Sequence, residues 1–389
     1  IFILDTYQTD VFADIVAEDP SWRDVFDGFT YFPDATSAFS KTYASVPNML
    51  TGTAFDNSRP FPEYFNEAYL GNSVPRLLKR NGFDVRYHAI VWAPYLAHPD
   101  VADNLAGFDS RDEIRWMRER ETTLLGNLLM FRLAPFALKP WVYNDDQFRL
   151  RPPHAPDSAG EDSGELAEDL RHYSVDNDHE DFAFLDEALA FLNSGSDRPT
   201  CRVYHLGGPH APFQVDADMN FTGPQEYAPG PFRDQSLASL KLMKIVFDRL
   251  RELEAYDNSL IVIAGDHGNG ELATLDIRTD ALVRLNGGTE ATACEDRELL
   301  EVIRGGIPLL LAKPPEATGP LSISEAPVEL GDIPATVVAT MALNGDVPGR
   351  SLFDAQPGPD RTRLHRHYQF AGWGQDFIVP MTEYVVDGF

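Results

Sequence analysis

The chain has 389 residues, 43% of them hydrophobic and 24% charged, a composition that predicts one or two folded domains and argues against intrinsic disorder. Asp and Glu number 61 against 32 Lys and Arg, which gives a formal net charge of −29. A surface of that sign repels polyphosphate, so nucleic acid is excluded as an expected partner.

The first predicted element is a strand over Ile1–Leu4, an apolar run that opens the chain with no initiator Met before it. We therefore expect a processed or trimmed chain. The next clear elements are a helix over Val74–Lys79, which ends at Asn81-Gly82, and an alternating strand over Phe83–Tyr87.

The most apolar stretch of the chain runs from Leu124 to Tyr143. Arg132, Lys139 and two prolines interrupt it, whereas a membrane span needs ~20 uninterrupted apolar residues. We expect a buried helical hairpin here, with a segment lying on a membrane surface as the alternative.

The second half of the chain begins with a strongly acidic stretch, Ser158 to Asp181, whose composition predicts a mobile loop. Apolar runs and helical periodicity then alternate along the chain. The elements predicted are a helix over Asp186–Leu192, a strand over Arg202–Leu206, a helix over Leu237–Leu253, a strand over Leu260–Ala264 and a strand over Ile307–Ala312.

This alternation of strands and helices predicts the fold class. Continuous apolar strands separated by helices are typical of an α/β fold, with a mainly parallel sheet covered by helices on both faces. Two cysteines, Cys201 and Cys294, are too few for a disulfide framework and could form one bridge or remain free thiols.

Polar side chains follow three of the predicted strands, at the point where each strand ends. Asp5 follows the first strand, His210 follows Arg202–Leu206 through a Gly-Gly-Pro turn, and Asp266-His267 follows Leu260–Ala264. Each alone is typical of a helix cap or a turn. Because ligands bind beyond the carboxyl ends of strands in open α/β sheets, the three together predict a site for zinc or manganese.

A hydroxyl residue, Thr42, precedes another helix-like apolar run. It could simply cap that helix. It could also lie where backbone N–H groups attract an anion, and there a metal would lower the pKa of the hydroxyl and make it a nucleophile.

Several motifs, spread along nearly the whole chain, match the pattern of one family in the same order. They are Leu4-Asp5-Thr6, Thr42 to Gly52, His205 to Phe213 with its His-x-Pro loop, Asp257-Asn258-Ser259 leading to Gly265-Asp266-His267-Gly268, Gly331 to Thr336, and Pro348 to Leu352. On these residues the chain resembles the alkaline phosphatase superfamily, on its sulfatase-like branch. The resemblance implies an alkaline-phosphatase-like sandwich and a metal-dependent hydrolase or transferase.

The residue at the nucleophile position separates the subgroups of that branch. True sulfatases carry Cys or Ser there, oxidised to formylglycine, and a threonine cannot give that aldehyde. Thr42 resembles instead the nucleophile of phosphoethanolamine and phosphoglycerol transferases. The resemblance implies one divalent metal held by Asp5, Thr42, Asp266 and His267, with zinc preferred and manganese, calcium or magnesium as alternatives.

Two histidine positions have roles in this scheme. The resemblance implies that His210 contacts the transferred phosphoryl group or protonates a leaving oxygen. Its neighbours Ala211-Pro212-Phe213 are apolar, which predicts a partly desolvated imidazole. His205 is expected to be a strand residue that faces the core, and His365 and His367 belong to a basic patch that could cover the cleft.

Together these features predict a catalytic α/β domain over residues 1–312 and a smaller C-terminal subdomain over 313–389. The expected function is phosphoryl transfer or phosphodiester cleavage, through Thr42, on a lipid or glycan of the cell envelope. The alternatives are a sulfuric ester hydrolase and a catalytically degenerate binding or assembly module. Relatives of this type imply an extracytoplasmic location, in the periplasm or cell envelope, with a membrane anchor upstream of residue 1.

Overall fold

The computed structural model describes residues 1–89, 94–96, 98–104, 126–144, 147–148, 197–270, 272, 297–358, 361–368 and 376–387. The predictions made for Ser158–Asp181, for Asp186–Leu192 and for Cys294 lie outside these residues. Cys201 is a free thiol on a strand of the main sheet.

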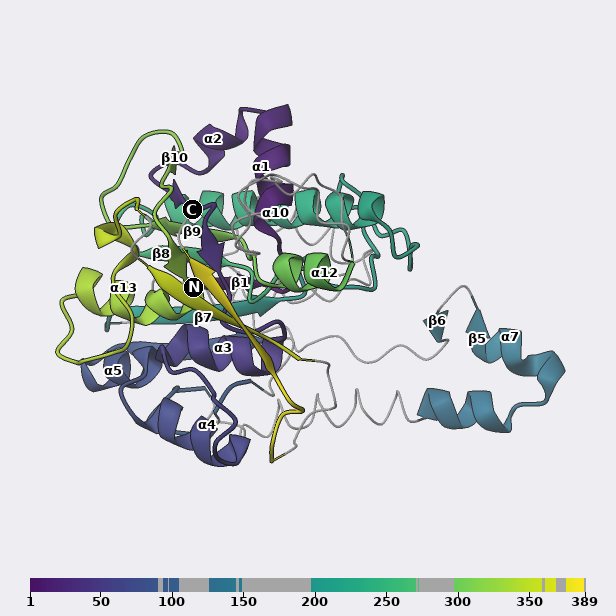
Figure 1. Ribbon diagram of the computed structural model, residues 1–389. Helices are drawn as coiled ribbons and strands as arrows, with labels where there is room; N and C mark the ends of the chain where they lie inside the picture. The colour runs from purple at the N-terminus through teal and green to yellow at the C-terminus, as the bar shows by residue number, and fades with distance from the viewer. Residues whose placement is uncertain are drawn as a thin grey trace.

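A seven-stranded sheet forms the centre of the molecule, in the order β10-β2-β9-β8-β1-β7-β4 (Figure 1). The neighbours β8, β1, β7 and β4 pair in parallel, and β9 runs antiparallel to both of its neighbours. The strands are β1 (Phe2–Leu4), β2 (Thr30–Tyr31), β4 (Asp84–Ala89), β7 (Thr200–Leu206), β8 (Ile261–Ala264), β9 (Leu310–Lys313) and β10 (Ser322–Ile323).

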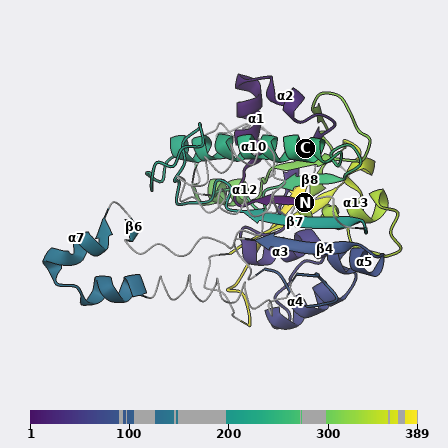
Figure 2. The same ribbon diagram turned by 180° about the vertical axis from the view of Figure 1, so that it is seen from behind.

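Helices cover both faces of this sheet, as Figures 1 and 2 show from opposite sides. Along β1, Phe2 and Leu4 pack into one hydrophobic core and Ile3 into the other, which is the period-two alternation of a strand. The first core takes side chains from α1 (Thr9–Glu18), α2 (Trp22–Val25) and α10 (Pro229–Glu252). The second takes side chains from α3 (Thr42–Thr51), α4 (Phe61–Leu70), α5 (Val74–Arg80) and α13 (Ile333–Thr340).

The expected α/β architecture, with a mostly parallel sheet between helices, is therefore confirmed. The predicted elements lie within a few residues of the observed ones, except that α10 begins at Pro229 rather than near Leu237. Proline is favoured in the first turn of a helix, because that turn leaves its N–H groups without helical partners. Two elements beyond residue 313, β10 and α13, belong to the main sheet and to its second core.

The apolar stretch near residue 130 is where the prediction of burial is wrong. Residues 126–133 are helical and are followed by η1 (Phe136–Leu138), α7 (Lys139–Val142), β5 (Tyr143–Asn144) and β6 (Gln147–Phe148). Leu133 is 73% exposed and Phe136 is 89% exposed. Hydrophobicity alone predicted burial, but nothing in the described part of the chain covers these side chains. We call residues 126–144 the apolar arm.

None of the helices in the described ranges combines the length and the apolar character needed to cross a bilayer.

The remaining described elements are short. They are β3 (Ala35–Thr36) paired with β11 (Val328–Glu329), α12 (Arg297–Gly305), η2 (Leu330–Asp332) and η3 (Leu352–Asp354).

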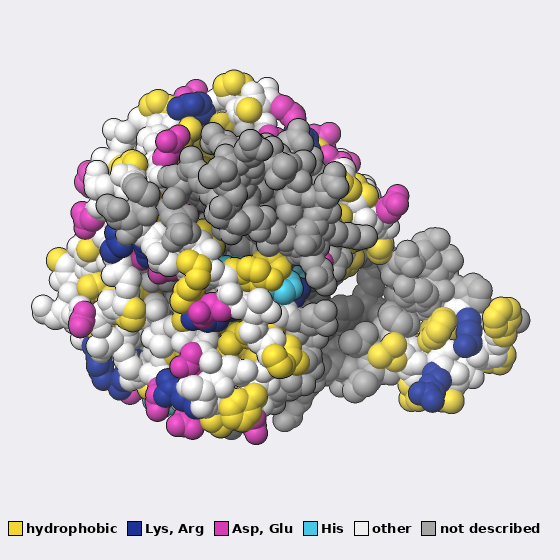
Figure 3. Space-filling model, viewed as in Figure 1, with side chains coloured by type: hydrophobic (Ala, Val, Ile, Leu, Met, Phe, Trp, Pro, Cys, Tyr) yellow, Lys and Arg dark blue, Asp and Glu magenta, His cyan; other side chains and the backbone are white. Residues whose placement is uncertain are grey.

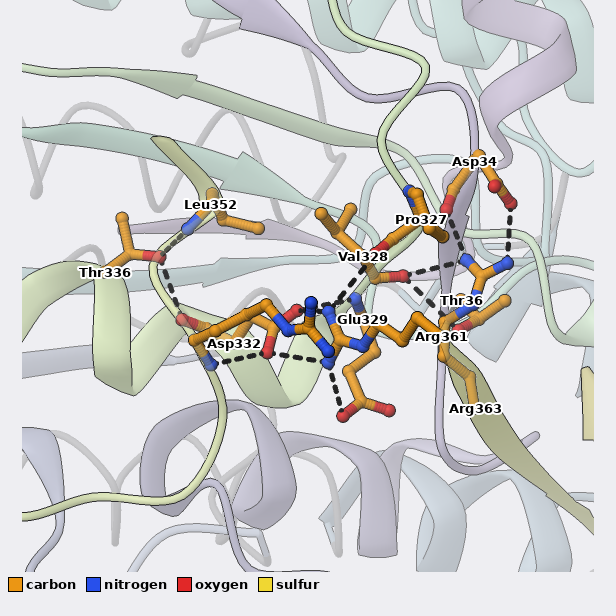
Figure 4. Close-up of polar contacts among 11 residues, drawn as sticks. Asp34, Thr36, Pro327, Val328, Glu329, Asp332, Thr336, Leu352, Arg361 and Arg363 are labelled. Atoms are coloured by element: carbon orange, nitrogen blue, oxygen red, sulfur yellow. Dashed lines mark hydrogen bonds and ion pairs between the residues drawn. The ribbon is translucent and has the colours of Figure 1, made fainter. Parts of the chain in front are cut away.

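A small antiparallel sheet closes the chain, formed by β12 (Thr362–His367) and β13 (Thr382–Asp387). Arg361, Arg363 and His365 are buried at alternate positions along this segment. Arg363 donates hydrogen bonds to Asp34, and Arg361 forms ion pairs with Glu329 and Asp332 (Figure 4). These charged contacts attach the C-terminal hairpin to the main body.

Candidate metal and catalytic site

Three neighbouring strands, β8, β1 and β7, end at the same edge of the sheet and carry the polar side chains there. Asp5 directly follows β1, His205 is the penultimate residue of β7, and Asp266 follows β8 after one glycine. The backbone N–H of Asp5 donates to the carbonyl of Leu206, 3.1 Å away, which continues the β1–β7 pairing into the site. β1, which lies between β8 and β7, thus brings these residues together.

Two glycines fix the backbone around Asp266 and His267. A Cβ on Gly265 would lie 2.2 Å from the carbonyl oxygen of Tyr7, and one on Gly268 would lie 1.9 Å from that of Arg304. No real side chain tolerates such contacts, so only glycine allows the loop to approach these carbonyls. Packing therefore requires glycine on both sides of Asp266-His267.

The Asp266 carboxylate is completely buried, and only one of its two oxygens accepts hydrogen bonds. Its Oδ1 accepts hydrogen bonds from the backbone N–H groups of Thr6, at 3.0 Å, and His267, at 2.9 Å. Its Oδ2 has no hydrogen-bond partner, and the nearest basic atom is His267 Nε2 at 3.5 Å. Because an unpaired buried carboxylate oxygen is costly, this atom is a candidate metal ligand.

Asp5 repeats this pattern on the next strand. Its Oδ2 lies 3.5 Å from Thr42 Oγ1 and 3.6 Å from His205 Nε2, whereas its Oδ1 has no hydrogen-bond partner. Burial raises the pKa of Asp5, but the nearby histidines, His205 first, outweigh burial and lower that pKa to about 2. The group is thus ionised at neutral pH, as a metal ligand must be.

Thr42 is the first residue of α3, and its hydroxyl points at the same cluster. Its Oγ1 lies 3.3 Å from His267 Nε2. His267 Nδ1 lies 2.8 Å from the carbonyl oxygen of Gly268, and this acceptor assigns the ring proton to Nδ1. His267 Nε2 then presents a lone pair toward Thr42 and the two carboxylates.

The atoms without partners fit a divalent cation. Asp5, His205 and Asp266 are buried, and their ligand atoms lie within 4.8 Å of one another. Asp5 Oδ1, Asp266 Oδ2 and His205 Nε2 all lack a hydrogen-bond partner. A set of carboxylate oxygens and imidazole nitrogens is the donor chemistry of zinc and manganese sites. The structure therefore holds a buried candidate metal site.

The structure brings together the four residues named as the metal set from sequence, Asp5, Thr42, Asp266 and His267, and adds His205. The ligands predicted from sequence all follow the strands, and His205 was expected to face the core. It is fully buried, but its Nδ1 contacts the Tyr95 hydroxyl at 3.0 Å and its Nε2 faces Asp5. A histidine one position before the end of an apolar strand was the available signal.

His210 lies at the exposed rim of the site, and the predicted desolvation of its ring is wrong. The reason is that Phe213 turns away and packs into the first core, so the apolar neighbours do not cover the imidazole. The loop itself is fixed, because the Gln235 side chain donates to the carbonyls of Gly208 and His210, each at 2.9 Å. The ring of His210 is therefore open to a substrate on a rigid backbone.

His365 is buried beside the site rather than placed over a cleft. Its Nδ1 lies 2.7 Å from the carbonyl oxygen of Ser37, and the Ser37 hydroxyl donates to the carbonyl of Asp266 at 3.0 Å. The C-terminal hairpin thus contacts the loop that carries Asp266 and His267 through one serine. His365 therefore supports the loop of Asp266 and His267 instead of covering a cleft.

Comparison with known proteins places this geometry in a family. The family model described as Sulfatase matches residues 18–341. The chain belongs to the sulfatase family. This membership, with the buried candidate metal site, identifies a sulfatase-family enzyme of the alkaline phosphatase superfamily. No curated protein sequence matches the chain.

Solved structures show the same fold at low sequence identity. Ps i-CgsB, in complex with k-i-k-neocarrahexaose, has a TM-score of 0.53 and 15% identity, with 95% of this chain and 79% of that chain covered. The phosphonate monoester hydrolase SpPMH from Silicibacter pomeroyi has a TM-score of 0.51 and 16% identity, covering 94% and 78%. The phosphonate monoester hydrolase of Agrobacterium radiobacter has a TM-score of 0.51 and 13% identity, covering 96% and 81%. These likenesses confirm the alkaline-phosphatase-like fold of this sulfatase-family chain.

Proposed function

We infer that this sulfatase-family enzyme transfers or hydrolyses phosphoryl esters through Thr42, with a lipid or glycan of the cell envelope as the substrate class. The observation that carries the proposal is the position of the Thr42 hydroxyl, 3.5 Å from Asp5 and 3.3 Å from His267 at the start of α3. A threonine cannot become formylglycine, so the hydroxyl itself must act as the nucleophile.

Asp5, His205, Asp266 and His267 are the residues that would hold a divalent cation, with the Thr42 hydroxyl beside it. When bound, that cation supplies a lower pKa for the hydroxyl and neutralises charge that develops on oxygen. The backbone N–H groups at the start of α3 and the helix dipole favour an anionic group at this position. Zinc is the preferred ion in this proposal.

The chemistry proceeds in two displacements. In the first, Thr42 loses its proton to solvent, its Oγ1 forms a bond to phosphorus, and the ester P–O bond breaks. The leaving oxygen takes a proton from His210. In the second, an alcohol or water gives its proton back to His210 and attacks phosphorus, the Thr42 Oγ1–P bond breaks, and Thr42 regains a proton.

Family membership also favours a second candidate, a sulfuric ester hydrolase. One comparison separates the two. We expect the purified enzyme to turn over bis-p-nitrophenyl phosphate faster than p-nitrophenyl sulfate, with no gain from a formylglycine-generating enzyme. A higher rate on the sulfate that survives Thr42→Ala would overturn the choice of Thr42 and of phosphoryl chemistry.

Replacement of the nucleophile tests the covalent step directly. Thr42→Ala should lower turnover of the phosphodiester by at least about 10³-fold, while Thr42→Ser retains part of it. Mass spectrometry of the wild-type peptide that contains Thr42 should show the phosphoryl group, with the substituent that has not left, attached to that residue. Thr53→Ala, a change at a half-buried threonine outside the site, is the matched control and should leave turnover unchanged.

Replacement of His210 tests the division of roles. His210→Ala should lower turnover by about 10²–10⁴-fold, the usual contribution of a general acid–base group. The metal content and the unfolding temperature should not change, because the ring is exposed and four other side chains surround the candidate metal site. Loss of metal would make His210 a ligand, and unchanged turnover would make it a turn residue.

A further inference from the structure

The apolar arm, residues 126–144, carries a concentration of exposed apolar side chains. Of the ten large hydrophobic residues that are exposed in the described part of the chain, six lie between residues 128 and 138. They are Leu128, Leu129, Met130, Leu133, Phe136 and Leu138. In both ribbon views the arm lies apart from the main body (Figures 1 and 2). An apolar surface of this kind marks an interaction site.

The exposed side chains of the arm's helix spread over a wide arc instead of forming one stripe, although Asn127 on the same helix is buried. Leu128, Leu129 and Met130 occupy three successive helical positions, and each step turns the side chain by about 100°. A helix that docks into a protein groove presents apolar residues at i, i+3, i+4 and i+7, along one face. Exposure around a wide arc fits a fluid apolar medium better than a shaped groove.

The charge of the arm is opposite to that of the rest of the chain. Arg132 and Lys139 are its only charged residues, in a chain whose formal net charge is −29. Figure 3 shows hydrophobic and basic side chains on the coloured part of the arm, and no acidic ones. The Lys139 ammonium lies 4.8 Å from the centre of the Phe131 ring, so one basic group stacks on an apolar side chain. Lys139 therefore lies among the apolar side chains of the arm.

We propose that the apolar arm binds the surface of a lipid bilayer that contains anionic lipids. Its exposed Leu, Met and Phe side chains enter the boundary between headgroups and acyl chains, and Arg132 and Lys139 contact lipid phosphates. None of the described helices is long and apolar enough to span the ~30 Å hydrocarbon core, so we place the arm in the interface. Because the body is acidic, an anionic bilayer attracts the arm and repels the rest, which orients the enzyme on the surface.

A second copy of the chain is the less favoured occupant. Two chains of formal charge −29 repel each other, and the arm adds only two positive charges against that repulsion. An anionic bilayer repels the acidic body as well, but the apolar side chains of the arm are not confined to the single helix face that packing against a second copy would need. The proposal does not depend on the chemistry at Thr42, since the arm lies apart from the strand ends that carry the site.

Sedimentation with vesicles tests the proposal. The probes are vesicles of phosphatidylcholine alone and vesicles with about one third phosphatidylglycerol, at roughly 0.1 M salt. We expect the wild-type chain to bind the anionic vesicles, and Leu133→Ser with Phe136→Ser to reduce the apparent affinity by at least about tenfold. Both positions are exposed, so the double variant should keep the wild-type unfolding temperature and its turnover of a soluble phosphodiester.

Matched variants separate the possible causes. Ile323→Ser with Val385→Ser makes the same change at exposed apolar residues outside the arm and should bind like the wild type, as should Thr42→Ala. Arg132→Gln should reduce the preference for anionic vesicles. The proposal would be overturned if the wild-type protein binds neither kind of vesicle, or if the Leu133→Ser/Phe136→Ser variant binds the anionic vesicles as well as the wild type does. The proposal would also be overturned if the wild type does not bind vesicles but is a dimer without lipid, and the arm variant is a monomer. The occupant of the arm would then be a second copy of the chain.

Discussion

Two buried carboxylates, Asp332 and Asp266, are equally enclosed but differ in what surrounds them. Asp332 Oδ1 accepts hydrogen bonds from the backbone of Arg350, at 3.0 Å, and from the side chain of Arg361, at 2.8 Å. Its Oδ2 accepts from the backbone of Glu329, at 3.0 Å, and again from Arg361. Asp266 has two backbone donors on one oxygen and none on the other.

The difference separates a structural ion cluster from the candidate metal site. An isolated buried charge is unfavourable unless it is paired, and Arg361 pairs Asp332 completely (Figure 4). Asp266 and Asp5 lie among neutral or weakly basic groups, and both have an oxygen without a hydrogen-bond donor. The first cluster holds the C-terminal hairpin, whereas the second has the unpaired ligand atoms of a candidate metal site.

Removal of the pairing charge in the first cluster should have the largest effect on stability. Arg361→Met leaves the buried Asp332 and the half-buried Glu329 without their counter-charge, so the free energy of unfolding should fall by about 3–5 kcal/mol. Chemical denaturation of the metal-free protein measures this change. Arg350→Met alters an exposed arginine in the same region and should stay within about 0.5 kcal/mol of the wild type. Equal effects of the two variants would mean that Arg361 has no special role.

His365 lies between the two clusters and should give a smaller, pH-dependent effect. Burial and, against it, the hydrogen bond to Ser37 set the pKa of His365 at about 4, below its ordinary value of 6.5. Between about pH 6.5 and pH 4, His365 therefore binds a proton in the unfolded chain but not in the folded chain. This group makes stability fall as the pH falls through that window, by at most ~1.4 kcal/mol per pH unit.

The matched variant for this effect is His365→Asn, whose side-chain amide can donate to the Ser37 carbonyl as Nδ1 does. Unfolding of the metal-free variant should show a shallower pH dependence than the wild type between pH 4 and 6.5. An identical slope in the two proteins would show that His365 titrates normally in the folded state.

Much of the candidate site could be placed from sequence because parallel strands bring their carboxyl ends to one edge. Asp5, Asp266 and His267 could be placed together from strand order alone, without knowledge of side-chain positions. His205 was missed because a buried strand residue has the same signature whether it packs or binds. Thr42 could be placed by its motif and by the helix that follows it.

Other features could not be read from sequence for physical reasons. Arg363 and Asp34 pair across 329 residues, and no local pattern records a contact of that separation. Hydrophobicity in the apolar arm shows that water is an unfavourable environment but not which partner replaces it. The exposed rings and methyl groups of Phe136 and Leu133 were therefore predicted as buried.

The most direct test of the difference between the two clusters is a zinc titration of the metal-free protein. Calorimetry measures the binding and thermal denaturation measures the stabilisation. Both are applied to the wild type, Asp266→Asn and Asp332→Asn. The wild type should bind one equivalent, with a stabilisation of about 2.7 kcal/mol at a hundredfold excess over Kd. Asp266→Asn should lose both binding and stabilisation while its metal-free form is at least as stable as the wild type. Asp332→Asn should bind zinc normally but unfold more easily. Tight binding by Asp266→Asn, or none by the wild type, would contradict the assignment of a metal site.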